Sequence, residues 1–130
     1  GRGGDQAGHD GAHAFGGGTE AYPWEARQAL LWDARLLVNT TSLGMKGQPE
    51  LEIDLSRVDA KAVVTDIVYT PLRTKLLEDA AARGNRTVEG LGMLLHQAVR
   101  GFSLWFGVTP KVTQELHDMI ARDIDPGYGA

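Results

Sequence analysis

The chain has 130 residues, the length of one ordinary domain, and its 42% hydrophobic and 23% charged residues are typical of a soluble globular protein. Its 13 Lys and Arg against 17 Asp and Glu give a net charge of -4, which argues against a nucleic-acid partner held by a positive field. It has no cysteines and no apolar run near the roughly 18 residues that span a bilayer. Disulfide scaffolds, thiolate metal sites and a membrane partner are therefore excluded, and we expect a cytoplasmic protein.

Glycine is concentrated at the amino-terminal end, where eight of the 17 glycines fall within residues 1–18. Ordering such a backbone costs more conformational entropy than its few apolar groups regain by burial, so we expect a flexible arm there. Residues 125–130 are expected to form a second, frayed end. His9 and His13 lie four residues apart in the arm without a third ligand nearby, so we expect no metal site.

The first half of the remaining chain predicts strands separated by a helix. A short strand is expected at 19–22, and Pro23 suits the first turn of a helix that runs to Trp32. A short apolar run at 36–38 predicts a second strand. The nearly continuous β-branched run at 62–69 predicts a strand buried on both faces.

The second half predicts three helices and one more strand. Thr74 is the expected cap of a helix that turns Leu76, Leu77, Ala80 and Ala81 inward, and Gly84 is its expected left-handed end. A brief strand follows at 86–88. A long helix is expected over 91–106, and a last one over 110–124 with Thr109 as its cap. Strands and helices in this order predict an α/β fold with a parallel sheet and right-handed crossovers.

Ligands of an open parallel sheet bind beyond the carboxyl ends of its strands. The predicted strands end at 39–42, 67–69 and 89–93, which carry an amide and hydroxyls, a phenol, and closely spaced glycines. Asp66 could be catalytic, but a structural carboxylate bonded to backbone is commoner in a buried strand.

The long helix has an apolar stripe that runs from Leu91 to Phe106. Gly90, Met93 and Gln97 lie on a different face, at steps of three and four. The Gln97 amide can both donate and accept, which suits a polyhydroxylated small molecule, although spacing alone favours a solvated side chain.

Three stretches at these strand ends, Val38–Met45, Asp66–Leu77 and Gly90–Ala98, resemble the shikimate dehydrogenase family in order and separation. Phe102 and the run 105–107 extend the resemblance, which covers about residues 19–124. It implies a partial Rossmann-like parallel sheet flanked by helices. Residues 19–108 would form the second half of an NADP-binding domain. Residues 109–130 would form a terminal helix and tail, and the terminal helices would pack on a substrate domain.

The resemblance also implies roles at the matching positions. Asn39, Thr40 and Thr41 would lie along the dinucleotide, Ile67 would flank the nicotinamide with Gly90 and Met93 near the same ring, and Tyr69 and Gln97 would bind hydroxyl and carboxylate groups of shikimate. We therefore expect the three side chains at 39, 69 and 97 to gather around one cleft.

The family reduces 3-dehydroshikimate to shikimate, in the biosynthesis of chorismate and the aromatic amino acids, with a hydride from NADPH. Its catalytic Lys and Asp belong to an amino-terminal substrate domain without a counterpart here, so we expect this chain to be inactive alone. Two alternatives remain: a non-catalytic sheet fragment that forms a homodimer or a swapped assembly, and a relative that acts on quinate.

Overall fold

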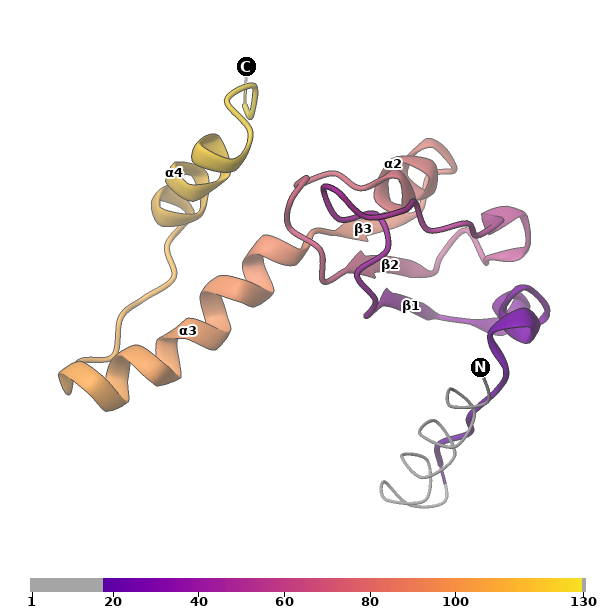
Figure 1. Cartoon of the computed structure of the whole chain (residues 1–130), viewed down its shortest axis with the longest axis horizontal. Coiled ribbons are helices and arrows are strands. Elements are labelled where there is room, and N and C mark those ends of the chain that lie inside the picture. The colour runs from indigo at the N-terminus through magenta and orange to yellow at the C-terminus, as the bar shows by residue number, and fades with distance from the viewer. Residues whose placement is uncertain (1–17, 130) are drawn as a thin grey trace.

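The computed structural model describes residues 18–129, so most of the predicted arm lies outside the described residues. Three parallel strands form one sheet in the order β1–β2–β3: Leu36–Asn39, Val63–Asp66 and Arg86–Val88 (Figure 1). The register pairs Asn39 with Asp66 and Thr65 with Val88. The predicted α/β class with a parallel sheet is thus confirmed, although β2 is shorter than the predicted run.

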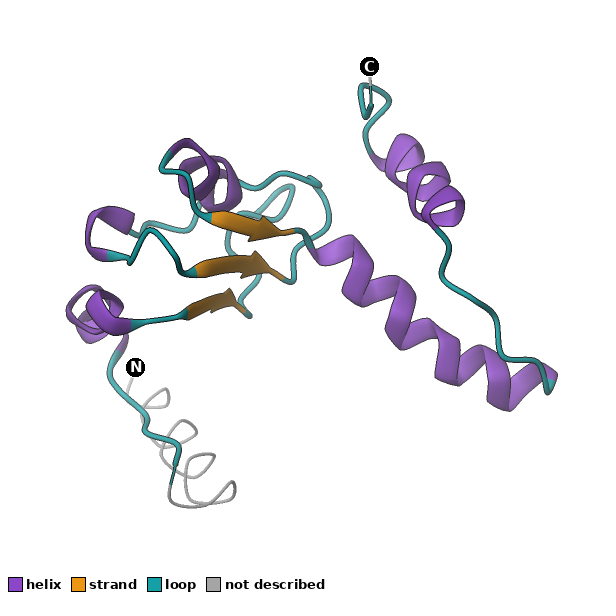
Figure 2. Ribbon diagram, turned by 180° about the vertical axis from the view of Figure 1, so that it is seen from behind, coloured by secondary structure: helices purple, strands orange, loops and turns teal. Residues whose placement is uncertain are grey.

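The helices join and flank these strands (Figure 2). Their bounds in chain order are η1 Trp24–Asp33, η2 Leu55–Arg57, α2 Lys75–Ala82, α3 Gly90–Phe106 and α4 Gln114–Ile124; η1 and η2 are 3-10 helices. Residues 19–22 form no strand, so that prediction was wrong. Tyr22 is exposed there, and the segment pairs with none of the three strands of the sheet.

The main core lies on one face of the sheet. It is built from nine apolar side chains of η1, η2, β2, α2 and the loops between them: Leu31, Leu51, Leu55, Val58, Ala62, Val64, Leu76, Leu77 and Ala80. On the opposite face Leu36, Val38 and Val88 remain 58%, 40% and 46% exposed. The expectation that β2 is buried on both faces was therefore wrong, because Val63 and Thr65 on that second face are only half-buried.

Helix α2 follows the predicted pattern with two differences. Gly84 ends it with a φ of 87°, in the left-handed region, as predicted. Ala81 is exposed because it lies on the solvent side of the helix, opposite to the expectation. Thr74 is at the cap position but makes no capping hydrogen bond with its side chain.

Helix α3 runs outward from the sheet, and α4 returns beside its first half (Figures 1 and 2). A second core joins the two helices to the loop before α2. Its buried members are Leu72, Leu91 and Ala121, and the half-buried Ile124 and Tyr128 pack against them. Beyond this contact Leu104, Trp105 and Phe106 are 75%, 82% and 64% exposed, so only the first half of the predicted apolar stripe is covered by described residues.

Helix α4 starts later than predicted. The chain turns at Gly107, which has a φ of 67°, and Thr113 rather than Thr109 caps the helix. The Thr113 hydroxyl oxygen accepts a hydrogen bond from the Leu116 N–H at 3.2 Å. At the other end, Tyr128 is held half-buried in the second core, which differs from a frayed end.

Removing this cap should weaken α4 specifically. We expect Thr113→Ala to lower the free energy of unfolding by about 1 kcal/mol, because one orphan N–H of the first turn loses its partner. Thr109→Ala is the matched control and should have a much smaller effect, since Thr109 lies outside α4. Urea unfolding followed by circular dichroism measures both. Equal losses for the two variants would contradict the placement of the cap at Thr113.

Candidate functional site

Three of the predicted dinucleotide-binding residues are neighbours at the carboxyl ends of the strands, an edge we call the rim. The carbonyl oxygen of Asn39 accepts a hydrogen bond from the Ile67 N–H at 3.1 Å. A Cβ placed on Gly90 would lie 2.6 Å from the Ile67 carbonyl oxygen. The backbone at the end of β1 therefore contacts the backbone just after β2, which in turn contacts the first residue of α3. The absence of a side chain at Gly90 permits this close approach.

Asp66 is the polar centre of the rim. Its side chain is 1% exposed, and its Oδ1 accepts hydrogen bonds from Asn39 Nδ2 at 3.0 Å and from the Val68 N–H at 2.9 Å. Its Oδ2 accepts one from the Thr74 hydroxyl at 2.7 Å, which explains why that hydroxyl does not cap α2. Asp66 thus joins the ends of β1 and β2 to the start of α2, and these contacts confirm the structural alternative for this residue.

The Asn39 side chain is fully used within the protein. Besides its bond to Asp66, Nδ2 donates to the Leu43 carbonyl oxygen at 3.1 Å. Oδ1 accepts from the Thr41 N–H at 3.0 Å and from the Thr41 hydroxyl at 2.7 Å. Both amide hydrogens and two acceptor positions are therefore occupied, and Asn39 shapes the loop in which Thr40 is exposed.

A small apolar cavity of about 160 Å³ lies beside β1. It is lined by side chains from η1, β1, α2 and the loops between them: Trp24, Arg27, Leu31, Leu37, Val38, Asn39, Thr40, Thr41, Leu51, Ile53 and Leu76. Three predicted dinucleotide-binding residues are among them. The Arg27 guanidinium stacks 4.5 Å from the centre of the Trp24 ring and closes one side.

Tyr69, Met93 and Gln97 are more open to solvent than Asn39 and Gly90. Ile67 is half-buried, whereas Tyr69 and Met93 are 38% and 46% exposed and Gln97 is exposed. Met93 and Gln97 follow Gly90 at helical spacing along α3. Tyr69 and Gln97 line neither this apolar cavity nor the larger one described below, so a single cleft shared by residues 39, 69 and 97 stays a prediction.

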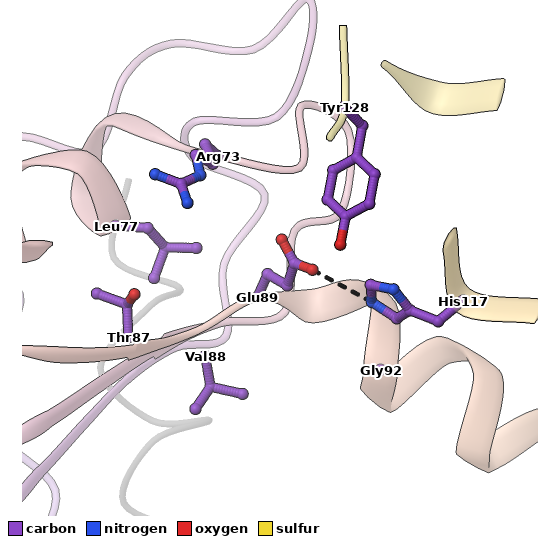
Figure 3. A pocket seen from close by; sticks show the side chains of 8 residues that line it. All are labelled: Arg73, Leu77, Thr87, Val88, Glu89, Gly92, His117 and Tyr128. Atoms are coloured by element: carbon purple, nitrogen blue, oxygen red, sulfur yellow. Dashed lines mark ion pairs between the residues drawn. The ribbon is translucent and has the colours of Figure 1, made fainter. Parts of the chain in front are cut away.

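A larger cavity of about 420 Å³ was not predicted from the sequence (Figure 3). It is lined by Arg73, Leu77, Thr87, Val88, Glu89, Gly92, His117 and Tyr128. His117 Nε2 lies 3.2 Å from Glu89 Oε1, so an ion pair links α4 to the residue before α3 when the imidazole is protonated. Burial raises the pKa of the Tyr128 phenol above its ordinary value. Glu89 and His117 are distant in sequence, and neither belongs to a recognisable motif.

Within residues 18–129, no cluster of three or more His, Asp or Glu side chains is arranged to hold a metal ion. In the same part of the chain, no helix combines the length and the apolar character needed to cross a membrane.

The comparisons with known sequences agree on one family. A family model described as the shikimate 5'-dehydrogenase C-terminal domain matches residues 90–114. A relative named shikimate dehydrogenase (NADP(+)) from Chelativorans sp. (strain BNC1) is 62% identical over 113 residues, which cover 87% of this chain and 40% of the relative. A relative of the same name from Rhodopseudomonas palustris (strain TIE-1) is 60% identical over 112 residues, which cover 86% of this chain and 40% of the relative.

Solved structures show the same relationship. The shikimate 5-dehydrogenase from Thermus thermophilus, in complex with NADP(H) and shikimate, has a TM-score of 0.65 and 32% identity, over 82% of this chain and 39% of that chain. The quinate dehydrogenase from Corynebacterium glutamicum, in complex with NAD, has a TM-score of 0.65 and 33% identity, over 74% of this chain and 34% of that chain. The chain spans about 40% of the length of the curated relatives just described. It belongs to the shikimate dehydrogenase family and corresponds to the carboxyl-terminal portion of its members.

Proposed function

We propose that this chain supplies one side of the active site of an NADP-dependent shikimate dehydrogenase. The observation that carries the proposal is the continuous rim from Asn39 through Ile67 to Gly90. The rim lies where ligands bind to an open parallel sheet, beyond the carboxyl ends of the strands. Residues 19–108 are then the second half of the NADP-binding domain, residues 109–130 are the terminal helix and tail, and the protein acts in the cytoplasm.

The rim suits the nicotinamide end of a dinucleotide. Ile67 is half-buried and Met93 is 46% exposed, so both can offer apolar surface to a flat ring. The exposed Thr40 and its half-buried neighbour Thr41 can donate hydroxyl hydrogen bonds further along the cofactor, in a loop whose shape Asn39 fixes. NADPH would supply the hydride for reduction of 3-dehydroshikimate, and these residues would bind and orient it.

Tyr69 and Gln97 would bind the hydroxyl and carboxylate groups of the substrate. Both side chains are exposed, and both can donate and accept hydrogen bonds, as a hydroxyl-rich carboxylate requires. The family's acid-base Lys and Asp have no matching positions in this chain. A positioned acid-base group contributes about 10²–10⁴-fold to rate, so we propose that the 130 residues alone have little turnover.

A chimaera tests this assignment directly. The 113 residues of the Chelativorans relative that match this chain are replaced by the residues of this chain. We expect the purified chimaera to oxidise shikimate with NADP, and Gln97→Ala to lower kcat/KM for shikimate by about tenfold or more, because a lost hydrogen bond to a charged group costs about 1.5–3 kcal/mol. Gln48→Ala is the matched control and should retain activity. A chimaera that melts cooperatively but does not turn over shikimate would refute the proposal.

The quinate alternative is favoured by one comparison, the quinate dehydrogenase that matches this chain with a TM-score of 0.65. Quinate has one hydroxyl more than shikimate, and the rim residues named here do not distinguish the two substrates. The ratio of kcat/KM for quinate and shikimate in the same chimaera separates the two functions. We expect shikimate to be preferred.

For the isolated chain we also propose a homodimer. Strand β1 is one of the two edges of the described sheet, and its own residues Leu36 and Val38 are 58% and 40% exposed. An unpaired edge strand with exposed apolar side chains favours association with a second copy. Sedimentation equilibrium over a range of concentrations should give the mass of two chains at the upper end. A single-chain mass throughout would exclude the dimer.

A further inference from the structure

The cavity between α2, β3, α3 and α4 carries opposite charges on facing walls (Figure 3). Arg73, Leu77 and Thr87 lie on one side of it, and Glu89, His117 and Tyr128 lie on the other. Its volume of about 420 Å³ is in the range of small-molecule sites. None of its lining residues is assigned above to NADP or to shikimate, so it would be a separate site.

Arg73 provides a positive charge on one wall of the cavity. Its side chain is exposed, and within residues 18–129 its guanidinium makes no hydrogen bond or ion pair. A guanidinium presents several N–H donors in a planar fork that matches the two oxygens of a carboxylate. The wall that carries Arg73 is therefore suited to a carboxylate ligand.

Glu89 provides the complementary anion. Its side chain is 27% exposed, and among the residues that the structure describes only Oε1 is paired, with His117 Nε2 at 3.2 Å. A carboxylate has about four acceptor positions, so Glu89 can accept further hydrogen bonds from a ligand. His117 Nδ1 lies 3.4 Å from Asp118 Oδ1, which holds the imidazole in place beside Glu89. This wall suits a hydrogen-bond-donating cation such as an ammonium group.

The remaining surface is partly apolar. Leu77 belongs to α2 and Val88 to β3, and both line the cavity together with the ring of Tyr128. A simple anion would pair with Arg73 but would be repelled by Glu89. A simple cation would pair with Glu89 but would be repelled by Arg73. A ligand with both charges and a short aliphatic group satisfies all of the walls.

We propose that this cavity binds a free α-amino acid with an aliphatic side chain. Its carboxylate would lie on Arg73, its ammonium group on Glu89, and its side chain against Leu77 and Val88. The ligand would bridge the loop before α2 to the start of α3, next to Gly90. Because the ligand would bind the folded state and not the unfolded state, it would also stabilise the chain against unfolding.

The test uses the whole 130-residue chain with L-leucine as the probe. NMR spectra of the His117 imidazole and the Tyr128 ring are followed up to about 10 mM probe, a range that covers weak small-molecule affinities. We expect saturable shifts of both signals. Isocaproate, which lacks the ammonium group, and isoamylamine, which lacks the carboxylate, should each bind at least about tenfold more weakly.

Two variants localise the site. Arg73→Gln should abolish saturable binding without affecting the fold, because Arg73 is exposed and its side chain makes no hydrogen bond or ion pair within residues 18–129. Arg86→Gln, on β3 but outside the cavity lining, is the matched control and should bind as the parent does. Unshifted signals, unchanged binding by Arg73→Gln, or equal binding of isocaproate would each overturn the proposal. The assay contains neither NADP nor shikimate, so its outcome is independent of the proposed dehydrogenase function.

Discussion

Gly90→Ala should be among the most damaging single substitutions in the described part of the chain. The added methyl group would lie 2.6 Å from the Ile67 carbonyl oxygen and 2.7 Å from that of Val68. Both contacts are with backbone, which cannot rotate away as a flexible side chain could. We expect the free energy of unfolding to fall by about 1–3 kcal/mol or more, because overpacking must displace either the start of α3 or the end of β2.

The control for this substitution is two residues away in the same helix. A Cβ placed on Gly92 meets nothing within 4 Å, so Gly92→Ala should stabilise the chain by about 0.5–1 kcal/mol through the helix propensity of alanine. Urea unfolding followed by tryptophan fluorescence compares the two variants. If Gly90→Ala were as stable as Gly92→Ala, α3 could not start as close to β2 as the structure places it.

Asp66→Ala should also be severely destabilising, by about 3 kcal/mol or more. The substitution leaves one of the two Asn39 amide hydrogens, the Val68 N–H and the Thr74 hydroxyl without their acceptor. Each buried donor that loses its partner costs about 1–3 kcal/mol. In the chimaera the same change should impair NADP binding as well, because the loop that carries Thr40 and Thr41 depends on Asn39.

The conservative variant distinguishes hydrogen bonding from packing. Asp66→Asn keeps the side-chain shape and one carbonyl acceptor, and the Thr74 hydroxyl can reverse its role and accept from the new amide. We expect it to retain most of the stability that Asp66→Ala loses. Asp123→Asn, at an exposed position of α4, should leave the unfolding midpoint unchanged. A midpoint for Asp66→Ala close to that of Asp123→Asn would show that the network contributes little.

Local sequence was sufficient for the framework of the fold. The apolar runs at β1 and β2 and the glycine after α2 are short-range signals, and each appears in the structure as a strand or a left-handed helix end. The rule for ligand position in parallel sheets selected the strand ends that hold Asn39, Ile67 and Gly90, and these three residues do lie side by side. The strands and the helix end depend on residues close together in the chain, whereas the contact between the strand ends follows from the parallel pairing of the strands.

The features that were missed depend on competition between distant groups. A threonine before a helix predicts a cap, but the Thr74 hydroxyl instead bonds to Asp66, which is buried and needs donors. Thr109 and Thr113 both precede possible helix starts, and only the hydrogen bond to Leu116 identifies the real one. The pairing of Glu89 with His117 requires α4 to fold back on α3, which no local pattern reveals.

The internal hydrogen bonds of Asn39 have a consequence for recognition at the rim. Because Asp66, Leu43 and Thr41 already satisfy this amide, the loop after β1 has its shape before any ligand arrives. A molecule that docks there would not have to immobilise this loop, so little of its binding energy would be lost to ordering the chain. Selectivity at this point of the rim would then come from how well the incoming molecule fits a rigid surface, since the loop is not free to adapt to it.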